Sequence, residues 1–111
     1  GIDPDAGAVA IGDLVETGDP VMFCRRDPQT AVDDLKRMLS DLKRRAGGNP
    51  IKGGLYFSCV ARGPNQFGPD SKELGMIRDE LGAFPLAGMF ANGEISNDRL
   101  YGYTGVLALF L

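Results

Sequence analysis

The sequence predicts an α/β domain in which a mixed sheet of five strands packs against two helices. Short apolar runs bounded by glycine and proline recur along the chain, as is typical of strands in a covered sheet. Two amphipathic stretches lie between such runs, at 28–46 and 70–81. The resulting order is ββαβαββ, and a helix between two strands favours a parallel pair.

The first two strands are expected at residues 8–11 and 21–26, on either side of a turn that contains glycine and proline. The first helix follows directly. Asp27 can cap its start, Pro28 suits its first turn, and Gly47 suits its end.

Charges of both signs alternate along this helix. Asp33 is spaced for an ion pair with Arg37, and Asp41 for one with Arg45. Such patterns are typical of a solvated helix face, so we assign its basic residues no function.

The central strand is expected at 55–61, because it is apolar on both alternating faces. Arg62 follows its end. The second helix is expected to begin with a capping box between Asp70 and Glu73, and Gly75 within it indicates close packing against a neighbour. The last two strands are expected at 84–91 and 100–111.

Composition narrows the function. The chain has 111 residues, a net charge of -3 and a pI near 4.8, so no overall basic field would attract nucleic acid or an anionic membrane. The longest apolar run, 106–111, is far shorter than the ~20 residues of a spanning helix. Cys24 and Cys59 form no CxxC pair and lie in apolar runs, as buried free thiols do. We expect a cytoplasmic domain, excised from a larger protein.

The chain has no histidine, which removes Cys-His and Ser-His catalysis and the usual zinc sites. We expect no metal and no cofactor. An enzyme would have to use Cys59, activated by Arg62 or a helix end, or Glu94 with a raised pKa. Cys59 also fits a core thiol.

Polar residues follow two of the apolar strands. Arg62 can fork two donors onto a carboxylate, and Gly63 lets backbone N–H groups approach a ligand. After the strand expected at 84–91, Glu94 can accept a hydrogen bond from an ammonium group. Two structural alternatives stay open: Arg62 can pair with Glu94, and Asn92 with Gly93 can form a hairpin turn that leaves Glu94 exposed.

Two hydroxyls lie near the same edge, on Tyr103 and Thr104. The full set of predicted ligand contacts is Ser58, Cys59, Arg62, Gly63, Asn92, Gly93, Glu94, Tyr103 and Thr104.

Several of these segments together resemble the C-terminal domain of the FIST family. The resemblance rests on residues 57–63, 85–95 and 103–104, and upstream on 18–21 and 26–27. It implies one domain over residues 1–111 that acts in bacterial signal transduction by sensing small ligands such as amino acids. It also implies an N-terminal FIST domain in the same protein as a partner.

The sequence thus favours a non-catalytic ligand-sensing domain for an amino acid or similar zwitterion, with Arg62 on the carboxylate and Glu94 on the amine. Two alternatives remain: a thiol-dependent transferase or hydrolase that uses Cys59, and a protein-interaction module.

Overall fold

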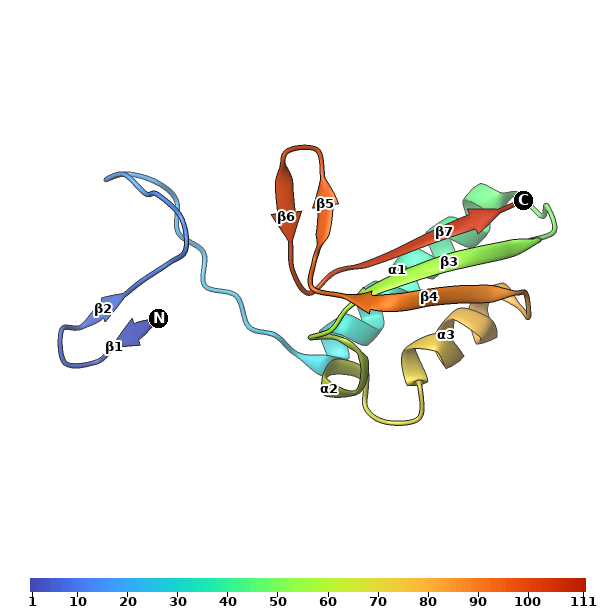
Figure 1. Cartoon of the computed structure of the whole chain (residues 1–111), viewed down its shortest axis with the longest axis horizontal. Coiled ribbons are helices and arrows are strands. Elements are labelled where there is room, and N and C mark those ends of the chain that lie inside the picture. Colours follow the sequence, from blue (N-terminus) through green and yellow to red (C-terminus); the bar gives the residue numbers. More distant parts are fainter.

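The computed structural model describes residues 1–111, which form an extended N-terminal arm, residues 1–26, and a layered body (Figure 1). The arm contains only two short strands, β1 (Ile2–Asp3) and β2 (Ala8–Val9), which pair with each other. The body contains, in order, α1 (Pro28–Ala46), β3 (Gly53–Cys59), α2 (Gly63–Phe67), α3 (Lys72–Leu81), β4 (Leu86–Ala91), β5 (Glu94–Ser96), β6 (Arg99–Tyr101) and β7 (Gly105–Phe110).

The sheet of the body has the strand order β4-β3-β7. β3 runs parallel to β4 and antiparallel to β7, so the predicted mixed sheet is confirmed. In the register, Tyr56 lies opposite Gly88 on one side and Leu107 on the other. A Cβ at Gly88 would overlap the carbonyl oxygen of Tyr56, so this close pairing requires glycine.

The first helix forms as its sequence predicts. The carboxylate of Asp27 accepts hydrogen bonds from the N–H (3.1 Å) and the hydroxyl (2.9 Å) of Thr30, which also lower the pKa of Asp27. Pro28 occupies the first turn, and Gly47 ends the helix in the left-handed conformation with φ 62°.

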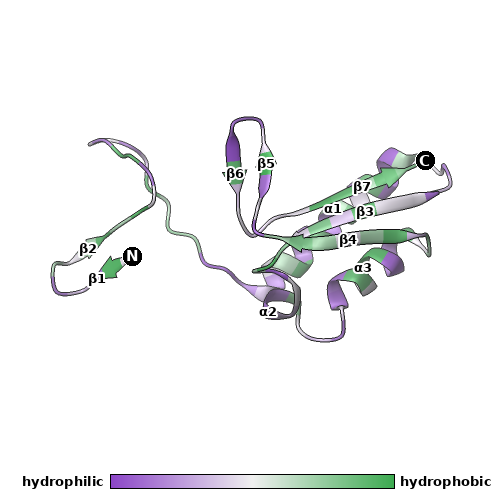
Figure 2. Cartoon of the chain, in the orientation of Figure 1, coloured by the Kyte–Doolittle hydropathy of each residue, from purple (hydrophilic) through white to green (hydrophobic).

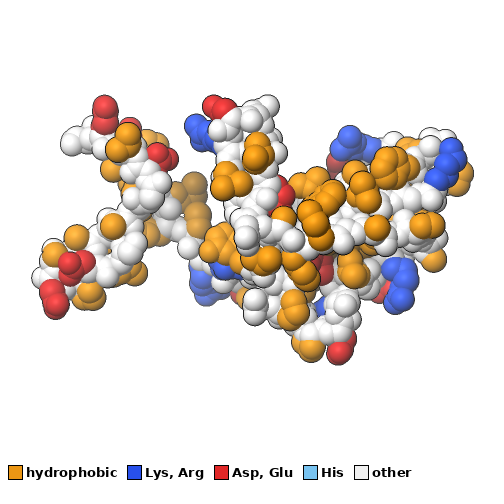
Figure 3. All heavy atoms as spheres, in the orientation of Figure 1, with side chains coloured by type: hydrophobic (Ala, Val, Ile, Leu, Met, Phe, Trp, Pro, Cys, Tyr) orange, Lys and Arg blue, Asp and Glu red, His pale blue; other side chains and the backbone are white.

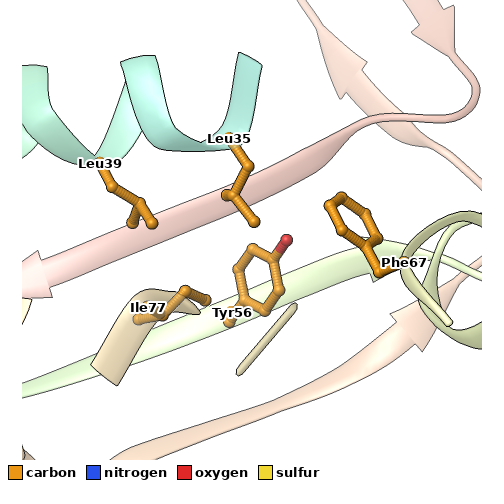
Figure 4. Packing of buried hydrophobic residues seen from close by; sticks show 5 residues of the cluster. All are labelled: Leu35, Leu39, Tyr56, Phe67 and Ile77. Carbon is orange, nitrogen blue, oxygen red and sulfur yellow. The ribbon is translucent and has the colours of Figure 1, made fainter. Parts of the chain in front are cut away.

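The core lies between the sheet and its helices. Leu35 and Leu39 of α1 meet Tyr56 of β3, Phe67 of α2 and Ile77 of α3, and Figure 4 shows these five side chains pointing toward one another. Both α1 and α3 therefore cover the same face of the sheet, which we call the helix face.

The five-stranded sheet is wrong. Residues 21–26 form no strand, and the predicted strand at 8–11 pairs only with β1 in the arm. Cys24, which is expected in a buried strand, is exposed in the arm. The predicted strand at 100–111 is two strands, because Tyr103 adopts φ 61° and breaks the extended run between β6 and β7. A strand needs a partner edge, and the sequence pattern alone does not supply one.

The helices also differ in detail. There are three rather than two, because residues 63–67 form the short α2. The capping box is wrong, since Asp70 and Ser71 both have positive φ and no side chain caps α3. Gly75 has open space around it, so its predicted close packing is also wrong.

The charges of α1 lie on a solvated face, as predicted, but its ion pairs join residues three apart rather than four apart. Arg37 pairs with Asp34 at 2.5 Å, and Arg44 pairs with Asp41. Both pairs are exposed and separated by three residues, so each contributes little to stability. No helix in the chain is both long enough and apolar enough to cross a membrane.

Candidate functional site

The predicted ligand contacts lie at one end of the sheet, where β3 and β4 end and β7 begins. The N–H of Cys59 donates to the carbonyl of Thr104 (2.9 Å), and the guanidinium of Arg62 donates to the carbonyl of Tyr103 (3.4 Å). The sequence pattern therefore locates a real cluster. Its charges, however, pair differently from either alternative, because the partner of Arg62 is Glu73.

Glu73 is the centre of a buried polar cluster. Its Oε1 accepts hydrogen bonds from the hydroxyl of Tyr56 (2.5 Å) and from Nε (3.0 Å) and Nη2 (2.7 Å) of Arg62. Its Oε2 accepts one, from the hydroxyl of Ser58 (3.2 Å). Only 6% of the Glu73 side chain and 12% of the Arg62 side chain are exposed, so this ion pair is largely removed from water.

The local fold explains this convergence. Tyr56 and Ser58 are two residues apart in β3, so both point to the helix face. Glu73 lies in the first turn of α3, four residues before Ile77, and therefore faces the sheet as Ile77 does. Arg62 is stacked over the ring of Phe67, 4.9 Å from its centroid, which fixes the guanidinium beside Glu73.

Burial and Glu73 determine the protonation of two groups in the cluster. Burial raises the pKa of Tyr56, and the hydrogen bond to Glu73 raises it further, so the phenol stays protonated. Burial acts to lower the pKa of Arg62, but the hydrogen bonds and charge interactions with Glu73 and Tyr56 together outweigh it, so the net shift of this pKa is upward.

A cavity of about 320 Å³ adjoins this cluster on the helix face, between β4, α2 and α3. Its polar lining includes Tyr56, Ser58 and Glu73, with the exposed Lys72. Its apolar lining includes Phe67, Leu74, Leu86, Met89 and Phe90. The volume is at the small end of the range for ligand sites, about 300 to 1,000 Å³.

Two of the predicted contacts, Ser58 and Gly63, line this cavity. A Cβ at Gly63 would lie 2.9 Å from the ring of Phe90, so the loop passes close to β4 only because the residue is glycine. Arg62 and Tyr103 instead line a smaller cavity of about 230 Å³ on the far side of the guanidinium, together with Arg26.

Arg26 contacts several residues around that smaller cavity. Its guanidinium stacks on the ring of Tyr103, 3.7 Å from the centroid, and donates to the carbonyl of Ala61 (2.8 Å) and to Gln66 (3.1 Å). The N-terminal arm is thereby fixed to the body at its last residue.

The second predicted charge, Glu94, is half-buried at the base of the β5–β6 hairpin. One of its oxygens accepts from the hydroxyl of Thr104, and the other, Oε1, is buried without a hydrogen-bond partner. The turn of the hairpin lies at residues 97–98 rather than at Asn92, so Glu94 is not left exposed after a turn. Gly93 has φ 146°, a conformation that favours glycine.

The remaining predicted contacts, Asn92 and Cys59, do not line either cavity. Asn92 is exposed, and Cys59 is buried with 4% of its surface exposed. No three acidic or cysteine side chains are grouped closely enough to hold a metal ion.

Glu73 and Lys72 are not among the residues that the sequence predicts for the site. The spacing of Glu73 from Asp70 fits a capping box, which indicates a structural role. Its spacing from Ile77 and Leu81 was the better signal, since residues four apart share a helix face and these two are apolar.

Comparison with known proteins assigns this chain to a family. Two uncharacterized proteins of Mycobacterium tuberculosis strains are 41% identical over 115 residues, and one of Mycobacterium bovis is 36% identical. Each alignment covers 100% of this chain but 30% of the relative, so the chain spans less than a third of their length. No solved structure matched the chain. The sequence model of the FIST C domain matches residues 1–97, so the chain belongs to the FIST C family, which comprises sensory domains of signal transduction.

Proposed function

We propose that this chain senses an amino acid or a similarly small zwitterion, which binds in the cavity between β4, α2 and α3 without being chemically changed. One observation carries the proposal. A single cavity of about 320 Å³ has the buried carboxylate of Glu73 in its lining and the ammonium of Lys72 beside it. Adjacent sites for a cation and an anion suit a molecule that carries both charges.

The amine of the ligand would be received by Glu73 Oε2. Three donors already occupy Oε1, whereas Oε2 accepts only from Ser58. Because a carboxylate oxygen offers about two acceptor sites, one on Oε2 is left for an ammonium group. Arg62 is a positioning residue in this proposal, since it fixes Glu73 without lining the cavity.

The carboxylate of the ligand would meet the ammonium of Lys72, which is next to Glu73 in α3. The N–H groups of the first turn of α3, which no side chain caps, could add hydrogen bonds to it. Phe67, Leu86 and Phe90 also line the cavity, which favours an aliphatic side chain on the ligand.

The contacts predicted at Arg62 and Glu94 stay predictions. The unpartnered Oε1 of Glu94 supports it as a second acceptor for an amine. A thiol-dependent reaction has less support, because Cys59 is buried and does not line the cavity. The proposal also includes an intracellular location and an N-terminal FIST domain of the same protein as the partner that receives the signal.

Isothermal titration calorimetry with each of the twenty common amino acids tests this function. We expect at least one to bind, and Lys72→Gln to weaken that binding about tenfold while Lys36→Gln, on the exposed surface of α1, leaves it unchanged.

Two further variants separate the sites. Loss of binding in Glu94→Gln or Arg62→Lys, with Lys72→Gln at full affinity, would move the ligand to the site that the sequence predicts. If no amino acid binds the folded chain, the proposed ligand class is wrong.

A further inference from the structure

The sheet has a second face, which no helix covers. We call it the outer face, and its exposed side chains include Leu55, Met89, Val106 and Phe110. The register places only glycine, alanine, cysteine and larger apolar residues on it, with no polar or charged side chain. Figure 2 shows the green of apolar residues along parts of β4 and β7, and Figure 3 shows orange side chains gathered over the sheet.

The exposed area of the whole chain is too large for a self-contained protein of this size. Its accessible surface is 8501 Å², against about 6,000 Å² for a compact monomer of 11.9 kDa. Its radius of gyration is 17.4 Å, against about 13 Å. The excess, about 2,500 Å², includes the arm, whose residues 1–26 are all exposed, and it exceeds the ~800 Å² that one partner buries in a standard interface.

The composition of the outer face indicates a permanent partner. Interfaces between proteins that also exist apart carry polar groups, whereas permanent interfaces resemble the core of a domain. A monomer seldom leaves an apolar patch of more than about 300–600 Å² in water. The arm has the same character, since Met22 and Phe23 are 83% and 86% exposed.

The comparisons indicate where such a partner is encoded. In the mycobacterial relatives, the region that matches this chain is 30% of the protein, so more than two thirds of each polypeptide lies outside it. We propose that the outer face of β4-β3-β7 is the docking surface for another domain of the same polypeptide, which packs an apolar layer against Leu55, Met89 and Val106.

The proposed function also includes a partner domain of the same protein, and the outer face is the surface on which that domain would dock. It does not depend on any ligand, so its test fails or succeeds independently of the calorimetry.

Thiol labelling tests it with two matched positions. In a Cys24→Ser background, a cysteine replaces either Val106 on the outer face, which does not line the ligand cavity, or Ile95 on the exposed β5–β6 hairpin. The same two substitutions are made at the aligned positions of the full-length Mycobacterium tuberculosis relative, whose own cysteines are replaced. Maleimide reaction rates are then measured in both proteins.

We expect both positions to react rapidly in this chain. In the full-length relative, the position aligned with Val106 should react at least tenfold more slowly, while the position aligned with Ile95 should keep its rate. Equal rates at the two positions of the relative would overturn the proposal. So would protection of Val106→Cys that grows with the concentration of this chain, because a second copy would then cover the face.

Discussion

The two faces of the sheet are built from the same strands and differ in almost everything else. On the helix face, Tyr56 and Ser58 of β3 meet a carboxylate and an apolar core, and helices cover them. On the outer face, Leu55 and Val106 remain 37% and 46% exposed, and no helix covers them. A buried polar group is stable only with hydrogen-bond partners, whereas a face without polar groups is stable only under another apolar layer. We therefore propose the helix face for a small ligand and the outer face for a partner domain.

The largest expected effect tests the polar side of this comparison. Glu73→Gln leaves the guanidinium of Arg62 buried without its counter-charge, which should cost about 3–5 kcal/mol of the free energy of unfolding. Glu80→Gln is the control, since its pair with Lys43 (3.3 Å) is exposed and should cost less than about 1 kcal/mol. Urea denaturation measures both.

The double variant Arg62→Met with Glu73→Met should recover most of that loss, because two apolar side chains replace a buried pair at little cost. A loss for Glu73→Gln no larger than for Glu80→Gln would show that the ion pair is open to water.

The apolar side of the comparison gives a smaller effect. Leu39→Ala empties a site with no exposed surface and should cost about 2–5 kcal/mol, whereas Leu55→Ala on the outer face should cost less than about 1.5 kcal/mol. Thermal or urea unfolding of this chain compares them. Equal losses would mean that the outer face is already covered, which would remove the difference between the faces.

The fold shows which part of such a structure the sequence predicts. α1 is local: Asp27, Pro28 and Gly47 fix its ends through neighbours in the chain. β3 is also predicted, because its two apolar faces mark a central strand. The strand expected at 21–26 is absent, and the one expected at 8–11 forms only as β2 in the arm, because their patterns give no information on which sheet edge they join.

The candidate site was half predicted for a similar reason. The cluster at the end of β3 is predicted, since Ser58, Arg62 and Gly63 lie together there, although β3 ends at Cys59, two residues before the predicted end. The partner of Arg62 was not, because Glu73 comes from another element and its local spacing also suits a cap. An ion pair between side chains of different helices or strands depends on how those elements pack, and a single sequence does not show that packing.

The smallest effect concerns the pH dependence of stability. Burial and then Glu73 raise the pKa of Tyr56, so the folded state holds this proton more tightly than the unfolded state. The resulting stability is present below the unfolded value near 10 and is lost as the pH rises through the higher folded value. The melting temperature should therefore fall above about pH 10, and Tyr56→Phe should make that fall shallower.

Circular dichroism melts from pH 8 to 11 measure this, with Tyr101→Phe as an exposed control that leaves the slope unchanged. Parallel slopes for all three proteins would exclude Tyr56 as the group responsible.

Methyl NMR distinguishes binding of the small ligand on the helix face from binding on the outer face. The chain is labelled on leucine and valine methyl groups and titrated with L-leucine, whose aliphatic side chain fits the apolar lining of the cavity. We predict that the methyl signals of Leu74 and Leu86, which line the cavity, shift in a saturable manner, while those of Leu55 and Val106 stay in place. Shifts confined to Leu55 and Val106, or no shifts at millimolar L-leucine, would contradict the account.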